Sequence, residues 1–96
     1  MDYKEQFKRN KKDYDLRRTY GICLDTYESM LEDQKECCYI CGKEPDRLYV
    51  DHCHDTGSVR KLLCIKCNTG LGLFNDSIKA MKKAMKHLME YAHEEV

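Results

Sequence analysis

Two pairs of cysteines frame the part of the chain whose residues are best suited to chemistry. The first pair is Cys38 and Cys41, the second is Cys64 and Cys67, and each pair has the Cys-x-x-Cys spacing. Four thiolates at this doubled spacing are typical of a tetrahedral zinc site, because each tight turn presents two sulfurs to one ion. A site closed by four sulfurs has no open position, so we expect this Zn²⁺ to stabilise the fold and not to take part in a reaction.

The remaining cysteines do not complete a disulfide framework, because the chain has 7 cysteines and this number is odd. Cys37 could replace Cys38 as a ligand, but its spacing to Cys41 is one residue too long for a tight turn, so we prefer Cys38. A redox pair would explain one Cys-x-x-Cys but not two.

A second set of candidate ligands lies inside this frame. Asp51, His52 and His54 stand between the two pairs, and Asn68 directly follows the last cysteine. A carboxylate and an amide oxygen suit Mg²⁺ or Mn²⁺, which keep several waters and accept phosphate. A neighbouring imidazole could then take a proton from water for attack on phosphorus. The alternatives are a polar hairpin with surface histidines, or a second zinc site, for which Asn is a poor ligand.

A β-hairpin is predicted to position these groups. Residues 48–50 are β-prone, residues 55–58 carry a turn signal, and residues 59–63 form the returning strand. The hairpin would place the histidines near its tip and return Cys64 to the side of Cys38.

Neighbouring side chains of a regular strand point to opposite faces of the sheet, so Asp51 and His52 would point away from each other. Both can serve one site only if a bulge, or the end of the strand, redirects one of them.

Helices are predicted on both sides of the hairpin. Apolar residues at helical spacing predict an amphipathic helix over 24–34, and a short helix over 64–73 carries Asn68 on its first turn. We expect Gly70 and Gly72 to shorten or distort this short helix.

A last helix is predicted along residues 77–94 from an apolar stripe, made of Ile78, Met81, Met85, Leu88 and Ala92. We expect the stripe to belong to the core, although Met81, Met85 and Met89 could also seat a partner helix.

Length and composition favour one small domain of 96 residues. Residues 1–20 form a charged arm or helix, and residues 21–96 form the domain, with its motif core at 38–75. No apolar run approaches the ~20 residues of a membrane helix, and the charged opening stretch does not resemble a signal peptide. We therefore expect no membrane association and a cytoplasmic location.

The formal net charge is zero, so charge alone does not indicate a nucleic acid partner. Basic side chains are nevertheless concentrated in residues 4–18 and in residues 79–86. Each cluster could be a solvated helix face or a phosphate-binding face.

The order of these motifs resembles the phage recombination endonuclease VII family, a group of HNH or ββα-metal nucleases. The resemblance is carried by residues 51–57, by residues 59–64 and by Cys67-Asn68, and it extends over residues 16–75. It implies a small zinc-stabilised α+β fold, in which a ββα-metal (HNH) motif with two zinc knuckles lies between an N-terminal helix and a C-terminal amphipathic helix.

The resemblance also implies a DNA endonuclease that depends on Mg²⁺ or Mn²⁺. The four paired cysteines match the structural zinc ligands, Asp51 and Asn68 match the residues that hold the catalytic cation, and His52 matches the general base. His54 matches a second histidine that contacts the scissile phosphate or assists at the metal. Arg60 and Lys61 are candidate contacts to the substrate phosphate. The family usually has glycine at the position of Lys61. A non-catalytic zinc module that binds nucleic acid is the alternative, and monomer and homodimer both remain open.

Overall fold

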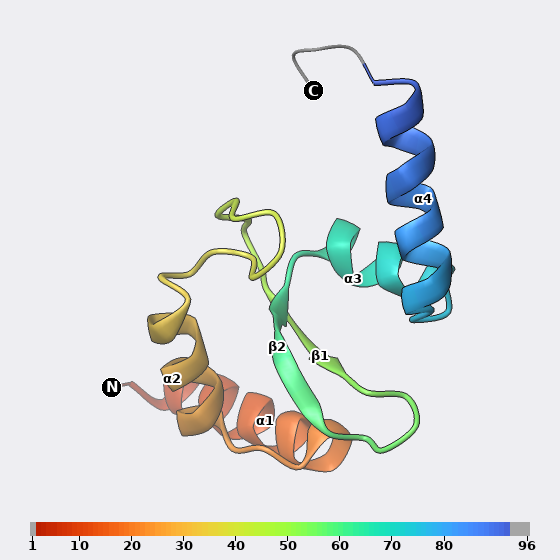
Figure 1. The fold of residues 1–96 in the computed structure, drawn as a ribbon. Helices are drawn as coiled ribbons and strands as arrows, with labels where there is room; N and C mark the ends of the chain where they lie inside the picture. Colours follow the sequence, from red (N-terminus) through yellow and green to blue (C-terminus); the bar gives the residue numbers. More distant parts are fainter. Residues whose placement is uncertain (1, 93–96) are drawn as a thin grey trace.

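The computed structural model describes residues 2–92, which form four helices and one two-stranded sheet (Figure 1). In chain order these elements are α1 Tyr3–Tyr20, α2 Leu24–Asp33, β1 Tyr49–His52, β2 Val59–Leu63, α3 Ile65–Leu73 and α4 Ile78–Glu90. The strands pair antiparallel, and α3 follows β2 directly. The predicted α+β fold with consecutive β, β and α elements is therefore confirmed. Within the described residues, no helix is both long and apolar enough to cross a membrane.

The first two helices are joined by a shared cap. A carboxylate oxygen of Asp13, in α1, accepts a hydrogen bond of 2.7 Å from the backbone N–H of Leu24, the first residue of α2. Asp13 also accepts from Arg17 at 2.8 Å. These two donors, the backbone N–H first, lower the pKa of Asp13. The side chain thus satisfies an N–H that the start of α2 leaves free, and it fixes α2 against α1.

The core lies where α1 and α2 pack against the hairpin. Leu62 and Leu63 of β2 are its most deeply buried side chains. Around them lie one residue of α1, two of α2, two from β1 and its approach, and two cysteines: Leu16, Leu24, Tyr27, Leu48, Val50, Cys38 and Cys64. The apolar core is therefore continuous with the region of the paired cysteines.

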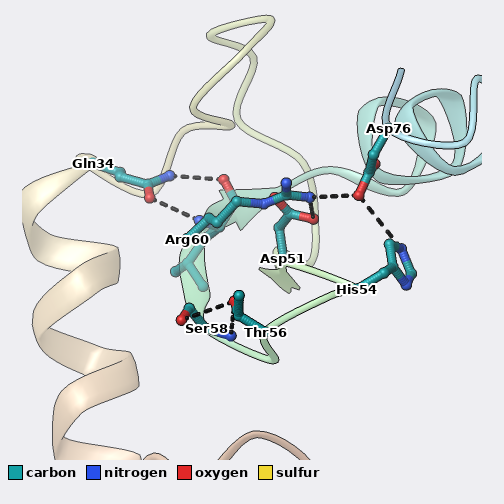
Figure 2. A network of polar contacts seen from close by, with 8 residues as sticks. Gln34, Asp51, His54, Thr56, Ser58, Arg60 and Asp76 are labelled. Carbon is teal, nitrogen blue, oxygen red and sulfur yellow. Dashed lines mark hydrogen bonds and ion pairs between the residues drawn. The ribbon is translucent and has the colours of Figure 1, made fainter. Parts of the chain in front are cut away.

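Gln34, just after α2, completes the free edge of β2. Its side-chain oxygen accepts from the N–H of Leu62 at 2.9 Å, and its side-chain nitrogen donates to the C=O of Leu62 at 2.9 Å. The same nitrogen donates to the C=O of Cys37 at 2.8 Å. One amide therefore pairs with the strand edge as a neighbouring strand would, and Figure 2 shows it beside β2. It also fixes the approach to the first cysteine pair.

Tyr27 offers a test of how α2 is held. Its hydroxyl donates a buried hydrogen bond of 2.7 Å to the C=O of Leu48. Replacing Tyr27→Phe should lower the free energy of unfolding by about 1–2 kcal/mol, because a buried carbonyl loses its partner. Urea unfolding of the zinc-bound protein measures this change. Tyr14→Phe is the control, since Tyr14 is exposed, and equal effects of the two changes would contradict the prediction.

Helices α3 and α4 correct two of our expectations. Both Gly70 and Gly72 lie inside α3, which runs without interruption to Leu73, so the expected distortion is wrong. The expectation that the stripe on the last helix is core is also wrong. Ile78 and Leu88 are 71% and 65% exposed, and α4 extends away from the body (Figure 1). The end of the expected range, residues 93–94, lies outside the described residues.

Candidate zinc centre and active site

The sulfur atoms of the two cysteine pairs converge on one point. The sulfurs of Cys38, Cys41, Cys64 and Cys67 all lie within 4.8 Å of one another, and those of Cys41 and Cys64 are 3.8 Å apart. A tetrahedral zinc with bonds of about 2.3 Å requires neighbouring sulfurs about 3.8 Å apart. The cluster therefore fits zinc in both the type and the spacing of its atoms.

Local backbone structure builds each half of this cluster. The N–H of Gly42 donates to the C=O of Cys38 at 2.9 Å, and the φ of 73° at Gly42 closes the first turn in a conformation that favours glycine. In the second pair, Cys64 is the N-cap of α3, and its sulfur accepts from the N–H of Cys67 at 3.5 Å. Cys37 lies outside the cluster, and its sulfur lies 3.3 Å from the C=O of Lys35.

The four thiols do not ionise alike. Burial of Cys38 opposes its ionisation, but the N–H groups of Cys64, Cys41 and Ile40 outweigh burial and lower the pKa of Cys38 to about 6. Burial, followed by the neighbouring cysteine sulfurs, raises the pKa of Cys67 to about 12. A divalent cation supplies the positive charge that would allow all four sulfurs to be thiolates together.

The hairpin contains the irregularity that the polar residues require. Val50 pairs with Leu62 and His52 pairs with Val59, so Asp51 stands opposite two residues, Arg60 and Lys61. Such a β-bulge changes the direction of the side chains around it.

Asp51 is buried in an ion pair with Arg60. The residue is only 7% exposed. Its carboxylate accepts hydrogen bonds from Arg60 Nε at 2.6 Å and from Arg60 Nη2 at 2.9 Å. Arg60 Nη2 also donates to Asp76 at 3.3 Å. These carboxylates, Asp51 first, raise the pKa of Arg60. The guanidinium is therefore held between two carboxylates, as Figure 2 shows.

The two histidines continue this network toward the surface. His54 Nε2 lies 3.7 Å from a carboxylate oxygen of Asp76, and the rings of His52 and His54 are 5.1 Å apart between their centroids. The ring of Tyr20, at the end of α1, lies 5.7 Å from that of His52. The sequence-predicted residues Asp51, His52, His54 and Arg60 thus belong to one connected group.

Asp76 is the member of this group that the sequence did not indicate. It lies between α3 and α4, where Asn75 and Asp76 both have positive φ, of 53° and 55°. Its sequence context, Asn75-Asp76-Ser77, is typical of a helix cap, and Ser77 is the N-cap of α4. The backbone conformation turns the chain back toward the hairpin, which no local pattern reveals.

The other two predicted residues lie apart from these contacts. Asn68 is half-buried near the start of α3, the helix that packs against both strands. Lys61 has its ammonium 5.4 Å from the ring of Tyr39, beside the first cysteine turn. Among the described residues, the four cysteines are the only group of three or more His, Cys, Asp and Glu side chains close enough to hold an ion together.

Comparisons with known proteins agree with this arrangement. The family model of recombination endonuclease VII matches residues 13–90. The Gene 59 protein of Mycobacterium phage L5 is 45% identical over 75 residues, which are 74% of this chain and 46% of that protein. The Gene 59 protein of Mycobacterium phage D29 is 43% identical over 74 residues, 73% of this chain and 45% of that protein. The chain thus spans about half the length of these relatives.

A solved structure is similar to the chain in three dimensions. The ββα-Me type II restriction endonuclease Hpy99I superposes with a TM-score of 0.54 at 28% identity. The match covers 75% of this chain and 50% of the Hpy99I chain.

Proposed function

This chain belongs to the recombination endonuclease VII family, and from that premise we propose that it is a metal-dependent endonuclease that hydrolyses DNA phosphodiester bonds. The observation that carries the proposal is a bulged hairpin bearing Asp51, His52 and His54, which leads directly into the four-cysteine cluster and α3. The likeness to a ββα-Me restriction endonuclease supports DNA as the substrate.

His52 is the proposed general base. It is half-buried, and its ring has those of Tyr20 and His54 as neighbours, which restrict its orientation. An imidazole so held can remove a proton from water as the water attacks phosphorus. His54 is exposed and its ring lies 5.1 Å from that of His52, so it is the proposed contact to the scissile phosphate.

Asp51 and Asn68 are the proposed ligands of a catalytic Mg²⁺ or Mn²⁺. The cation would stabilise negative charge on the phosphate and on the leaving oxygen. A buried carboxylate needs a positive partner, and Arg60 serves as that partner for Asp51. We infer that Arg60 and the cation both neutralise the negative charge of Asp51. Arg60 would keep its hydrogen bond to Asp76 when the cation binds. Arg60 and Lys61 remain proposed phosphate contacts.

Removing Arg60 tests the role of Asp51. Arg60→Ala should lower the free energy of unfolding by about 2 kcal/mol in the zinc-bound protein without Mg²⁺, since a mostly buried carboxylate loses its bidentate partner. Millimolar Mg²⁺ should recover much of this loss, while the same ionic strength of KCl should not. Urea unfolding with each salt gives the comparison, and Arg18→Ala on the exposed end of α1 is the control. Equal recovery by both salts would argue against cation binding at Asp51.

A non-catalytic zinc module that binds nucleic acid is the second candidate. It is favoured by one observation, that Arg60 engages both oxygens of Asp51. A buried ion pair of this kind can serve structure alone.

DNA cleavage separates the two candidates. We expect the zinc-bound protein to convert supercoiled plasmid into nicked or linear DNA with Mg²⁺ or Mn²⁺, and not in their absence. Branched and mismatched DNA should be offered in parallel. A protein that binds these DNA forms and cuts none of them would support the non-catalytic module.

A further inference from the structure

A groove lies between α1 and the chain segment that leads into β1. It encloses about 660 Å³. Lys8, Lys11 and Lys12 line it from α1, and Arg47 lines it from the opposite side. The three lysines lie on one face of the helix, because residues three and four apart in an α-helix share a face.

Positive charge exceeds negative charge in this groove, although the whole chain is neutral. Only two carboxylates, those of Asp15 and Asp46, are among the lining residues, and Asp15 is paired with Lys11 at 3.3 Å. A concave surface with an excess of one sign of charge raises the local concentration of ligands of the opposite sign.

Aromatic rings hold two of the cations in place. The ammonium of Lys12 lies 4.4 Å from the ring centre of Tyr27, and the guanidinium of Arg47 lies 4.9 Å from that of Tyr49. Each cation remains on an exposed residue, so it can still meet a ligand. Cations that are already positioned lose less side-chain entropy when a ligand binds.

Two residues that line the groove are neighbours of the proposed catalytic histidine, His52. Tyr20 and Val50 both line the groove. The ring of Tyr20 lies 5.7 Å from that of His52, and Val50 precedes His52 by two residues on β1. A chain-like anion in the groove would therefore be directed toward the imidazole.

We propose that this groove binds the sugar–phosphate backbone of duplex DNA beside the bond that is cut, with Lys8, Lys11 and Arg47 contacting phosphates. The proposal rests on the proposed nuclease function and adds the surface that receives the substrate. The proposed contacts go from cations to phosphates and not to base edges, so their contribution to affinity should not depend on sequence.

Equilibrium binding to a fluorescein-labelled 20-base-pair duplex tests this assignment. Binding is measured by anisotropy on the zinc-bound protein without Mg²⁺, so that it does not depend on cleavage. The groove variant carries Lys8→Gln, Lys11→Gln and Arg47→Gln. The matched control carries Lys79→Gln, Lys82→Gln and Lys83→Gln on α4, which removes the same number of charges from another helix.

The groove variant should bind roughly ten- to a hundredfold more weakly at 0.1 M salt, and its slope of log K against log salt should be smaller by about 2–3. The control variant should keep the affinity and the slope of the wild type. Equal weakening of both variants, or of neither, would overturn the groove assignment, as would a wild type that binds no duplex. If the protein binds DNA through the groove but cuts no DNA, the result would support the groove as a DNA-binding surface and would contradict the nuclease proposal.

Discussion

Replacing His52→Ala should reduce DNA cleavage by roughly 10²–10⁴-fold while leaving the protein folded, because a positioned general base typically contributes that much to a rate. His52 is outside the four-cysteine cluster, and it is half-buried at the end of β1. Its loss therefore removes the proton acceptor without removing a zinc ligand or a core side chain. Initial rates of plasmid nicking at saturating Mg²⁺ measure the effect.

The control for this change is His87→Ala. His87 lies on α4, where its ring is 5.4 Å from that of Tyr91, and the residue is exposed. This variant should nick plasmid at the rate of the wild type. DNA binding without Mg²⁺ and the unfolding curve should be unchanged in both variants. If His52→Ala nicks as fast as His87→Ala, another group takes the proton, and if His52→Ala unfolds, the imidazole is structural.

The hairpin and the cysteine cluster could be predicted because their signals are local. Each Cys-x-x-Cys pair forms a tight turn, and the β-prone segments around Gly57, with its φ of 77°, pair over a short loop. A bulge was one of two ways, with the end of the strand, in which neighbouring strand residues could serve one site, and the structure has a bulge in β2 opposite Asp51.

The partners of these residues could not be predicted in the same way. Asp76 reaches Arg60 across 16 residues of sequence, and Gln34 reaches Leu62 across 28. Such contacts depend on how the helices are placed around the hairpin, which periodicity does not encode. The sequence therefore does not indicate Asp76, and it suggests Arg60 as a phosphate contact or a solvated side chain but not as the partner of Asp51.

The apolar stripe of α4 failed as a core prediction for a related reason. Helical periodicity shows that one face of a helix is apolar, but not what covers that face. In the described residues, Met85 and Leu88 remain more than half exposed.

Removing the zinc should unfold the domain, and this is the largest change in stability that we expect. The two fully buried leucines of β2 lie next to Cys64, and Cys38 and Cys64 are themselves part of the core. A chain of 96 residues buries only a modest apolar surface. Binding of a structural zinc contributes on the order of 10 kcal/mol, which is comparable to the entire stability of a small domain.

Cys64→Ser removes one sulfur of the proposed zinc site and leaves a residue that can still cap α3, because serine is a favoured N-cap residue. We expect this variant to lack stoichiometric zinc, to lose its cooperative unfolding transition and to aggregate. Elemental analysis, together with circular dichroism during heating, measures both losses. Cys37→Ser is the matched control, because Cys37 is next to Cys38 in sequence but outside the cluster. It should keep its zinc and its fold, and a zinc-free Cys64→Ser protein that remained folded would show that the hairpin and α3 hold together without the metal.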